Sequence, residues 1–222
     1  MIEFQNVTKS YRDKVTKKRH YVFRELTFAV PPGRNIGMIG RNGAGKSTLM
    51  RLIAGSDVPD SGKIIAHQSI SWPVGLSGGF QSSLSARENV RFVARVQGVK
   101  GPDLQNIVRK VEEFAEIGPH FDRPVRTYSS GMRSRVGFGM SLAFDFDYYL
   151  VDEAMSVGDA HFREKAARAF KEKVGKANII LVSHSMSQIR KMCDCVLLIR
   201  NGQVELFDDI EAGIAEYELG AK

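Results

Sequence analysis

The chain has few of the features that mark exported or disulfide-stabilised proteins. Its 222 residues include two cysteines, Cys193 and Cys195, in the segment CDC, a spacing too close for an ordinary structural disulfide. No run of about 18 or more apolar residues is present. The opening segment MIEFQNVTKSYRDK has acidic and polar residues where a signal peptide needs an apolar core. We therefore expect a soluble, unexported chain in a reducing, cytoplasmic setting.

The chain has fewer acidic than basic residues. Lys and Arg total 32 against 25 Asp and Glu, which gives a formal net charge of +7. This balance favours a polyanionic partner, and a nucleic acid, an acidic membrane surface or an acidic polymer would each satisfy it. A well-solvated surface without such a partner is the alternative. The hydrophobic content of 43% suffices for a core in one domain, or in one domain with a subdomain.

The N-terminal part of the chain predicts strands followed by a loop and a helix. Apolar and polar residues alternate in MIEFQNVTKSYR and in YVFRELTFAV, and the basic stretch KVTKKRH between them predicts a hairpin tip. A short apolar strand at 35–39 runs into a glycine-rich loop. STLMRLIAG then has helical spacing and ends at a glycine.

From residue 85 onward, the sequence predicts a helical segment followed by alternating strands and helices. Residues 85–126 contain two amphipathic stretches, ARENVRFVARVQG and DLQNIVRKVEEFAEIG, around the breaker KGPD. Three short apolar runs, YYLV, NIILV and CVLLI, follow with helical segments between them. This alternation is typical of a parallel sheet buried on both faces, so we predict an α/β fold. DDIEAGIAEYELGAK predicts a terminal helix.

The segment GRNGAGKST satisfies the phosphate-loop pattern G-x-x-x-x-G-K-[ST] between a predicted strand and a predicted helix. Its glycines allow backbone N–H groups to converge on phosphates, and the helix presents its positive N-terminus to them. Lys46 would reach the β- and γ-phosphates, and Ser47 would place its hydroxyl on Mg²⁺. The sequence therefore predicts a site for a nucleotide and Mg²⁺.

Three polar side chains follow apolar strands, at the edge where α/β sheets bind ligands. Asp152 and Glu153 end the run YYLVDE, and His184 follows NIILV. Asp152 would orient Mg²⁺ or its waters, and Glu153 could polarise an attacking water. A lone histidine at a strand end is more often a structural residue, but the end of a central strand favours a role beside the nucleotide.

The segment YSSGMRSR precedes the helical stretch VGFGMSLAF. Small residues and a glycine at a helix start can bind an anion without a lysine. The alternative is an ordinary N-cap, in which Ser129 or Ser130 accepts a backbone hydrogen bond. Taken alone, this segment favours the N-cap.

Together, GRNGAGKST, YSSGMRSR, YYLVDE, SVGD and SH resemble, in this order, the motifs of the nucleotide-binding subunit of ATP-binding cassette (ABC) transporters. The resemblance covers essentially the whole chain and implies ATP and Mg²⁺ as cofactors. It also implies a P-loop NTPase core with an antiparallel β subdomain and a helical insertion. The single domain 1–222 would consist of a core, 1–84 and 127–222, and a helical subdomain, 85–126.

Each matched residue takes a role from this resemblance. Asp152 becomes the Walker B carboxylate and a Mg²⁺ ligand beside Ser47. The catalytic residues become the base Glu153, the switch histidine His184 at the γ-phosphate, and Lys46. Tyr11 becomes the aromatic that stacks on adenine, with Tyr21 as its competitor. The remaining nucleotide contacts are the loop residues Gly40, Asn42, Gly43, Ala44, Gly45, Lys46, Ser47 and Thr48, the signature residues Ser129 and Gly131, and the D-loop residue Asp159.

The chain departs from the family pattern in two places. The signature has Tyr128, Ser130 and Met132 where the family has Leu, Gly and Gln. The Q-loop glutamine, a nucleotide and Mg²⁺ ligand, is assigned to Gln81. However, an ungapped match of LSARENV to the family's L-T-x-x-E-N would put that glutamine near Leu76.

In this family the signature of one subunit closes on the nucleotide of the other. The resemblance therefore implies a homodimer around two ATP, with Ser129 acting in trans. Each subunit would drive a separate integral membrane permease from the cytoplasmic face of the inner membrane, as a peripheral protein without a nucleic-acid partner.

A narrower resemblance lies in SISWPVGLSGGFQSSLSARENVRFVAR and TYSSGMRSRVGFGMSLAFDFDYYLVDE. Both are similar to the ATPase subunits of capsular polysaccharide exporters, relatives of O-antigen and teichoic acid exporters. The implied substrate is an acidic, lipid-linked polysaccharide that touches the permease. The stretch after His184 suffices for a strand and a helix but for no further domain. This favours the capsule type over O-antigen relatives with an added carbohydrate-binding domain.

Two other classes fit less well. A soluble cassette ATPase acting on nucleic acid or ribosomes would match the basic charge, but such proteins usually carry two cassettes or a long coiled coil. A P-loop kinase or GTPase would have no use for YSSGM or His184, and the sequence contains no guanine-reading NKxD segment. The sequence therefore favours an exporter ATPase.

Overall fold

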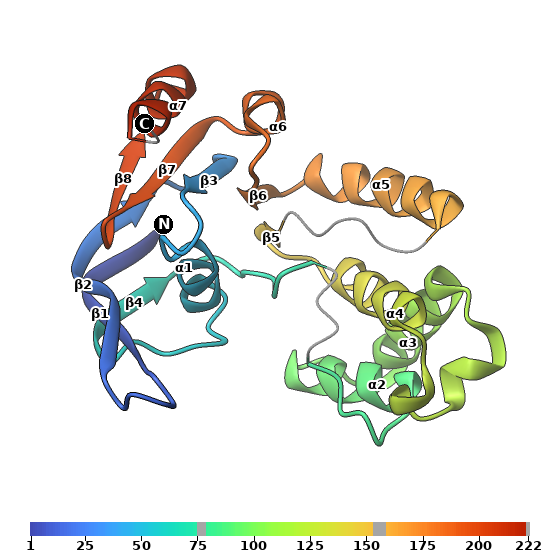
Figure 1. Cartoon of the computed structure of the whole chain (residues 1–222). Helices are drawn as coiled ribbons and strands as arrows, with labels where there is room; N and C mark the ends of the chain where they lie inside the picture. The colour runs from blue at the N-terminus through green and yellow to red at the C-terminus, as the bar shows by residue number, and fades with distance from the viewer. Residues whose placement is uncertain (75–78, 153–158, 221–222) are drawn as a thin grey trace. The chain divides into compact units, whose positions relative to one another are not determined.

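The computed structural model describes residues 1–74, 79–152 and 159–220 (Figure 1). The chain divides into two compact units. The first unit comprises Met1–Trp72, Phe146–Glu153 and Ala177–Lys222, and the second comprises Pro73–Asp145 and Ala154–Lys176.

An antiparallel sheet of three strands begins the first unit. The strands are β1 (Ile2–Arg12), β2 (Arg19–Val30) and β4 (Ser61–Ala66), in the order β2-β1-β4. The predicted hairpin is confirmed, and its register pairs Tyr11 with His20. β4 was not predicted, because SGKIIA lacks the period-two alternation of a half-buried strand.

The second sheet carries the predicted parallel strands. Its order is β5-β6-β3-β7-β8, formed by β3 (Ile36–Gly40), β5 (Tyr148–Val151), β6 (Asn178–Val182), β7 (Cys195–Arg200) and β8 (Gln203–Phe207). β5, β6, β3 and β7 run parallel and are almost wholly buried, which confirms the α/β prediction. β8 is antiparallel and was not predicted. The sequence feature that indicates this strand is the pair Asn201-Gly202 between β7 and β8. Both residues have positive φ, as a tight hairpin turn needs.

Helices α1 (Lys46–Ile53), α6 (Met186–Met192) and α7 (Ile210–Leu219) complete the first unit. One apolar core joins both sheets to α1, with Phe4, Phe23, Met38 and Leu49 among its members. Both cysteines are free and buried, and Cys195 belongs to this core. Burial raises the pKa of the Cys193 thiol to about 12.

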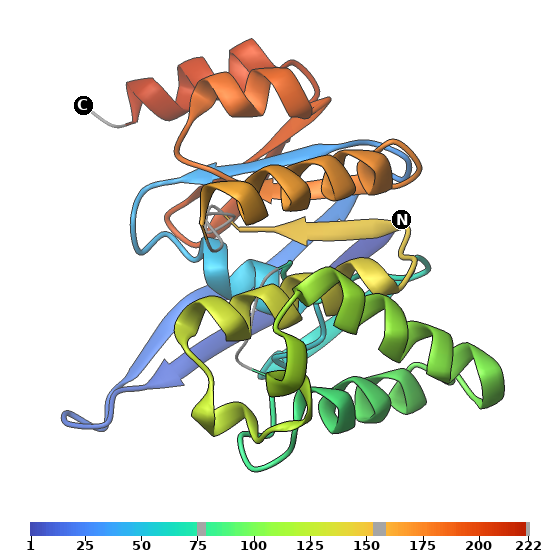
Figure 2. The same ribbon diagram turned by 90° about the vertical axis from the view of Figure 1, so that its right-hand side faces the viewer.

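The second unit is helical. It contains α2 (Ala86–Val96), α3 (Gly101–Ala115), the short 3₁₀ helices η1 (Gly118–Asp122) and η2 (Val125–Thr127), α4 (Ser130–Ala143) and α5 (Ala160–Val174). α3 packs against α2 and α4, as Figure 2 shows, and α4 packs against α5. This unit extends beyond the predicted helical segment 85–126 because α4 and α5 pack with it.

Aromatic rings form the centre of this second core. The Phe114 ring stacks on Phe138, with centroids 6.0 Å apart, and meets Phe162 edge-on at 5.5 Å. Gly139 of α4 allows this approach, since a Cβ there would lie 3.0 Å from Phe114 Cδ1. Among the helices of residues 1–74, 79–152 and 159–220, none is both long and apolar enough to cross a membrane.

We expect Gly62→Ala to destabilise the protein through β4. Gly62 has φ +84°, and a Cβ there would overlap the Asn6 carbonyl and lie 2.6 Å from the Gln5 carbonyl oxygen. Gly33→Ala is the matched control, because Gly33 has φ +71° but no atom of the residues that the structure describes lies within 4 Å of the added carbon. The control should lose about 1 kcal/mol of unfolding free energy in urea, and Gly62→Ala about 2–4 kcal/mol. Equal losses would contradict the steric argument.

Candidate functional site

The phosphate loop joins the end of β3 to the start of α1, as predicted. Gly45 is the N-cap of α1 with φ +111°, and a Cβ there would lie 2.7 Å from Val22 Cγ1 and 2.8 Å from Phe23 Cζ. A Cβ on Gly40 would lie 2.6 Å from the Ile199 carbonyl oxygen. Glycine is therefore required at both ends of the loop, which β2 and β7 hold in place.

Lys46 places its ammonium inside this loop. The side chain is buried, with 8% exposure, and its Nζ donates to the carbonyl oxygens of Gly40 at 2.6 Å and Arg41 at 3.0 Å. The first turn of α1 contains no acidic residue and no side-chain cap. A buried cation beside an uncapped helix N-terminus is suited to an anion such as a phosphate.

A cleft of about 360 Å³ within the first unit collects residues that lie far apart in the sequence. Tyr11 comes from β1, Asp152 follows β5 and His184 follows β6. The other predicted residues on its wall come from the loop and the first turn of α1. Gly40 and Ala44 are not on this wall. The complete lining is Tyr11, His20, Val22, Asn42, Gly43, Gly45, Lys46, Ser47, Thr48, Asp152, Val182 and His184.

Parallel sheet topology explains why the polar side chains meet. β5, β6 and β3 are neighbours running in one direction, so Asp152, His184 and the loop follow strand ends at the same sheet edge. Asp152 is half-buried and His184 is exposed. The Ser47 hydroxyl and the Asp152 carboxylate are oxygen ligands of the kind that Mg²⁺ prefers, so the cleft fits a magnesium–nucleotide. Glu153 lies outside the described residues.

The cleft separates the two tyrosine candidates. Tyr11 lies on its wall, whereas Tyr21 lines a neighbouring cavity of about 500 Å³ with Arg41 and Ala44. The Tyr21 ring is also covered by the Arg24 guanidinium, 3.6 Å from its centroid. This arrangement favours Tyr11 as the aromatic beside the loop. His20 also lines the cleft and was not predicted, although it pairs with Tyr11 across the predicted hairpin.

In the second unit, Ser129 is the N-cap of α4, and its Oγ accepts a hydrogen bond from the Met132 N–H at 3.2 Å. The N-cap interpretation is therefore correct for Ser129. Among the described residues, a Cβ on Gly131 would meet only Ser129 Oγ, at 3.8 Å, so these residues leave the surface at this turn open. Asp159 caps α5 and pairs with Arg135 at 2.6 Å. Hydrogen bonds from the Phe162 N–H and from Arg135 hold the pKa of Asp159 below its usual value.

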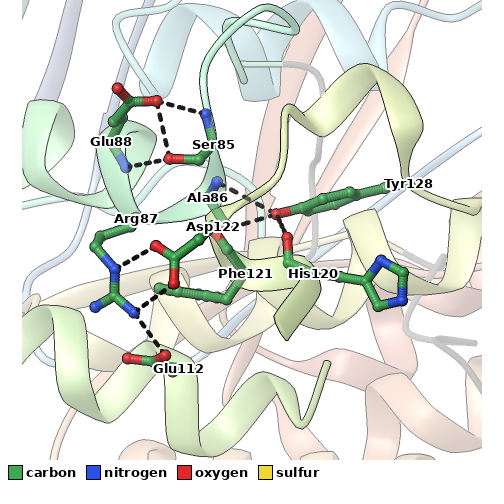
Figure 3. Close-up of polar contacts among 9 residues, drawn as sticks. All are labelled: Ser85, Ala86, Arg87, Glu88, Glu112, His120, Phe121, Asp122 and Tyr128. Carbon is green, nitrogen blue, oxygen red and sulfur yellow. Dashed lines mark hydrogen bonds and ion pairs between the residues drawn. The ribbon is translucent and has the colours of Figure 1, made fainter. Parts of the chain in front are cut away.

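Tyr128, the first departure from the signature pattern, ties α4 to the start of α2 (Figure 3). The side chain is 5% exposed, and its hydroxyl donates to the His120 carbonyl at 2.7 Å and accepts from the Ala86 N–H at 3.3 Å. Burial raises the pKa of this hydroxyl. A leucine could make neither bond, so the tyrosine at this position has a structural role in the second unit.

Gln81 lies five residues before Ala86, whose N–H is bonded to the Tyr128 hydroxyl. Its N–H donates to Asn89 Oδ1 at 2.8 Å, and its carbonyl accepts from Asn89 Nδ2 at 3.1 Å. Residues 82–84 then bond to η2 through Arg126 N–H to Ser82 O, 2.8 Å, and Val125 N–H to Leu84 O, 2.9 Å. The Gln81 side chain is exposed, and its role as a ligand remains a prediction. Leu76, the alternative Q-loop position, lies outside the described residues.

α2 itself starts with a reciprocal cap. Ser85 Oγ accepts from the Glu88 N–H at 3.2 Å, and the Glu88 carboxylate accepts from the Ser85 N–H at 2.8 Å. Arg87 lies between Ala86 and Glu88 in the first turn of α2, and it donates to Asp122 and Glu112, each at 2.6 Å (Figure 3). The start of α2 is thus bonded to η1 and α3.

Tyr128→Phe should destabilise the protein, because it leaves the Ala86 N–H and the His120 carbonyl without the hydroxyl inside a buried site. We expect a loss of about 1–3 kcal/mol in the free energy of unfolding, measured by urea denaturation. Tyr217→Phe on the half-buried face of α7 is the control and should change it by less than about 0.5 kcal/mol. A Tyr128→Phe variant as stable as the control would contradict the assigned bonds.

Comparisons with known proteins agree with this geometry. Residues 23–156 match the family described as ABC transporter. The polysialic acid transport ATP-binding protein KpsT of Escherichia coli is 52% identical over 220 residues, which cover 99% of this chain and 97% of that protein. The capsule polysaccharide export ATP-binding protein CtrD of Neisseria meningitidis is 41% identical over 217 residues, 98% of either chain.

A solved structure has the same fold. It is the dimeric structure of a post-hydrolysis state of an ATP-binding cassette bound to ADP and Pi, with a TM-score of 0.70 and 20% identity, covering 92% of this chain and 97% of the other. The family match extends from β2, through the phosphate loop and the signature, past Asp152. The chain therefore belongs to the ABC transporter family, as one of its ATP-binding cassettes.

Proposed function

We propose that this chain is the ATP-hydrolysing subunit of an exporter of acidic, lipid-linked capsular polysaccharide. The observation that carries the proposal is the cleft that gathers Lys46, Ser47, Asp152 and His184 in one unit. Similarity over nearly full length to a polysialic acid transport protein and a capsule polysaccharide export protein supports the choice of substrate.

The cleft would hold ATP through the loop amides and Lys46 at the phosphates, with the Tyr11 ring on adenine. Ser47 and Asp152 would hold Mg²⁺, which when bound neutralises phosphate charge and polarises the phosphoryl group. Lys46 is already oriented by two carbonyl oxygens, so its ammonium is positioned before the nucleotide arrives. An ammonium held in this way loses less conformational freedom when phosphate binds than the ammonium of a surface lysine would, and this favours phosphate binding.

Glu153 would accept the proton of the attacking water, and His184 would contact the γ-phosphate from the end of β6. Gln81 would complete the Mg²⁺ and nucleotide contacts. Ser129, Gly131 and Asp159 would act in trans, since the chain carries one motif set and needs a second copy to complete each site. The active species would be a homodimer around two ATP.

The polysaccharide would touch a separate integral membrane permease and not this subunit. The permease would dock near Gln81 and the helical unit, and hold the ATPase as a peripheral protein on the cytoplasmic face of the inner membrane. The basic charge of the chain would then lie against acidic lipid headgroups.

Glu153→Gln should bind ATP, lose turnover by about 100-fold or more and accumulate as a dimer with ATP, because the general base is removed while the phosphate contacts remain. Phosphate release and size-exclusion chromatography measure the two effects. Lys46→Ala should lose ATP binding itself. Glu172→Gln, on the exposed face of α5, is the matched control and should keep full turnover. Full turnover by Glu153→Gln would remove that residue from the base role.

Purification from detergent-solubilised membranes tests the transport assignment. We expect a protein with several membrane spans to be recovered with the ATPase, and the Glu153→Gln chain to block delivery of polysaccharide to the cell surface. Hydrolysis stimulated by RNA in the absence of a permease would instead favour a cassette ATPase that acts on nucleic acid.

A further inference from the structure

We propose that Asp57 and Arg51 are positioning residues, which hold the Tyr11 ring at the cleft so that it stacks on the purine base of the nucleotide. This inference deepens the proposed function and rests on it. Neither residue belongs to the nucleotide-binding motifs, and neither lines the cleft. They would act on nucleotide binding through Tyr11.

The Tyr11 hydroxyl is bonded on two sides. It donates to Asp57 Oδ2 at 2.6 Å and accepts from Arg51 Nη2 at 3.1 Å. Both partners carry charge, and such hydrogen bonds are stronger than neutral ones. The side chain is 36% exposed, so without them packing alone would leave it a choice of rotamers. The two bonds select one orientation while the ring stays on the wall of the cleft.

Asp57 is itself fixed by a buried lysine. Lys9 Nζ donates to Asp57 Oδ1 at 2.6 Å and to the Val58 carbonyl at 2.7 Å, and Lys9 is 7% exposed. Burial would raise the pKa of Asp57, but hydrogen bonds from Lys9 and Tyr11 outweigh it and hold the pKa below its usual value. The carboxylate is therefore charged at neutral pH and is a permanent acceptor for the Tyr11 hydroxyl.

Two cations also lie close to the Tyr11 ring. Lys9 Nζ is 5.0 Å from the ring centroid, and Arg51 Cζ is 5.8 Å from it. Both distances are within the range of cation–π attraction. The ring is thus held by contacts to its π-system as well as by its hydroxyl.

Helix α1 connects this arrangement to the phosphate loop. Arg51 Nη2 also lies 3.4 Å from Thr48 Oγ1, in the first turn of the same helix. At the other end, the N–H groups of Ser56 and Asp57 donate to the Arg51 carbonyl at 3.0 and 3.2 Å. A helix of eight residues spans about 12 Å. One rigid element would therefore set the separation between the phosphate and base subsites.

Calorimetric titration of the full chain with ADP and with pyrophosphate, both with Mg²⁺, tests this inference. ADP carries the base and pyrophosphate does not, and neither is hydrolysed by an ATPase. Tyr11→Phe keeps the ring but removes both hydroxyl contacts, and Asp57→Asn removes the charged acceptor. Each should weaken ADP binding roughly three- to tenfold and leave pyrophosphate binding unchanged. Tyr11→Ala, which removes the ring, should weaken ADP binding roughly tenfold or more.

Tyr21→Phe is the matched control, because this tyrosine is on the neighbouring strand and faces the other cavity. It should bind both ligands like the wild type. The double variant Tyr11→Phe/Asp57→Asn should bind ADP no more weakly than whichever single variant loses more affinity. Both changes break the same hydrogen bond, so their effects should not add. Unchanged pyrophosphate affinity also reports that each variant has folded.

Wild-type affinity for ADP by Tyr11→Phe would overturn the inference. A second result would also overturn it: the wild-type chain binds ADP and pyrophosphate with equal affinity, and Lys46→Ala binds neither. The phosphate site would then be present, but the base would contribute nothing to binding. Binding of neither ligand by the wild-type chain would overturn the proposed function, and this inference with it.

Discussion

The close approach of the phosphate loop to strands of both sheets is the constraint on which the candidate site depends. Gly45 lies against Val22 and Phe23 of the antiparallel sheet, and Gly40 lies against Ile199 of the parallel sheet. No side chain fits at either glycine without displacing a neighbour. The loop is therefore fixed to both sheets, which brings Tyr11 of the hairpin into the same cleft as Asp152 and His184. The packing of this loop thus adds a residue of the antiparallel sheet to two residues that the parallel sheet topology already places at one edge.

The sequence predicted the parts of this arrangement that local patterns control. The buried parallel strands appear as unbroken apolar runs, and the loop and the strand-end residues Asp152 and His184 follow from spacing and strand polarity. β4 and β8 lie at sheet edges with partly exposed residues, so their hydrophobic patterns are weak. The extent of the helical unit depends on packing between α3, α4 and α5, which no single segment of sequence contains.

Tyr128 shows a further limit of reasoning from motifs. The sequence reveals that the residue differs from the family pattern, but its partners are backbone groups of Ala86 and His120 in remote segments. Backbone groups have no sequence signature. Ser129 shows how two interpretations can hold together. Its hydroxyl uses a lone pair to accept the Met132 N–H, and a hydroxyl that accepts can still donate its proton to a phosphate oxygen. Capping and anion binding are therefore compatible at this residue.

The burial of Lys46 has a consequence for the energetics of the cassette. Its ammonium leaves water during folding and is solvated by the carbonyl oxygens of Gly40 and Arg41. Most of the desolvation cost of this charge is therefore met before any nucleotide arrives, which lowers the stability of the folded chain and increases its affinity for phosphate. A ligand that binds only the folded state returns this free energy as added stability. The unfolding temperature of the first unit should consequently rise with the concentration of free nucleotide.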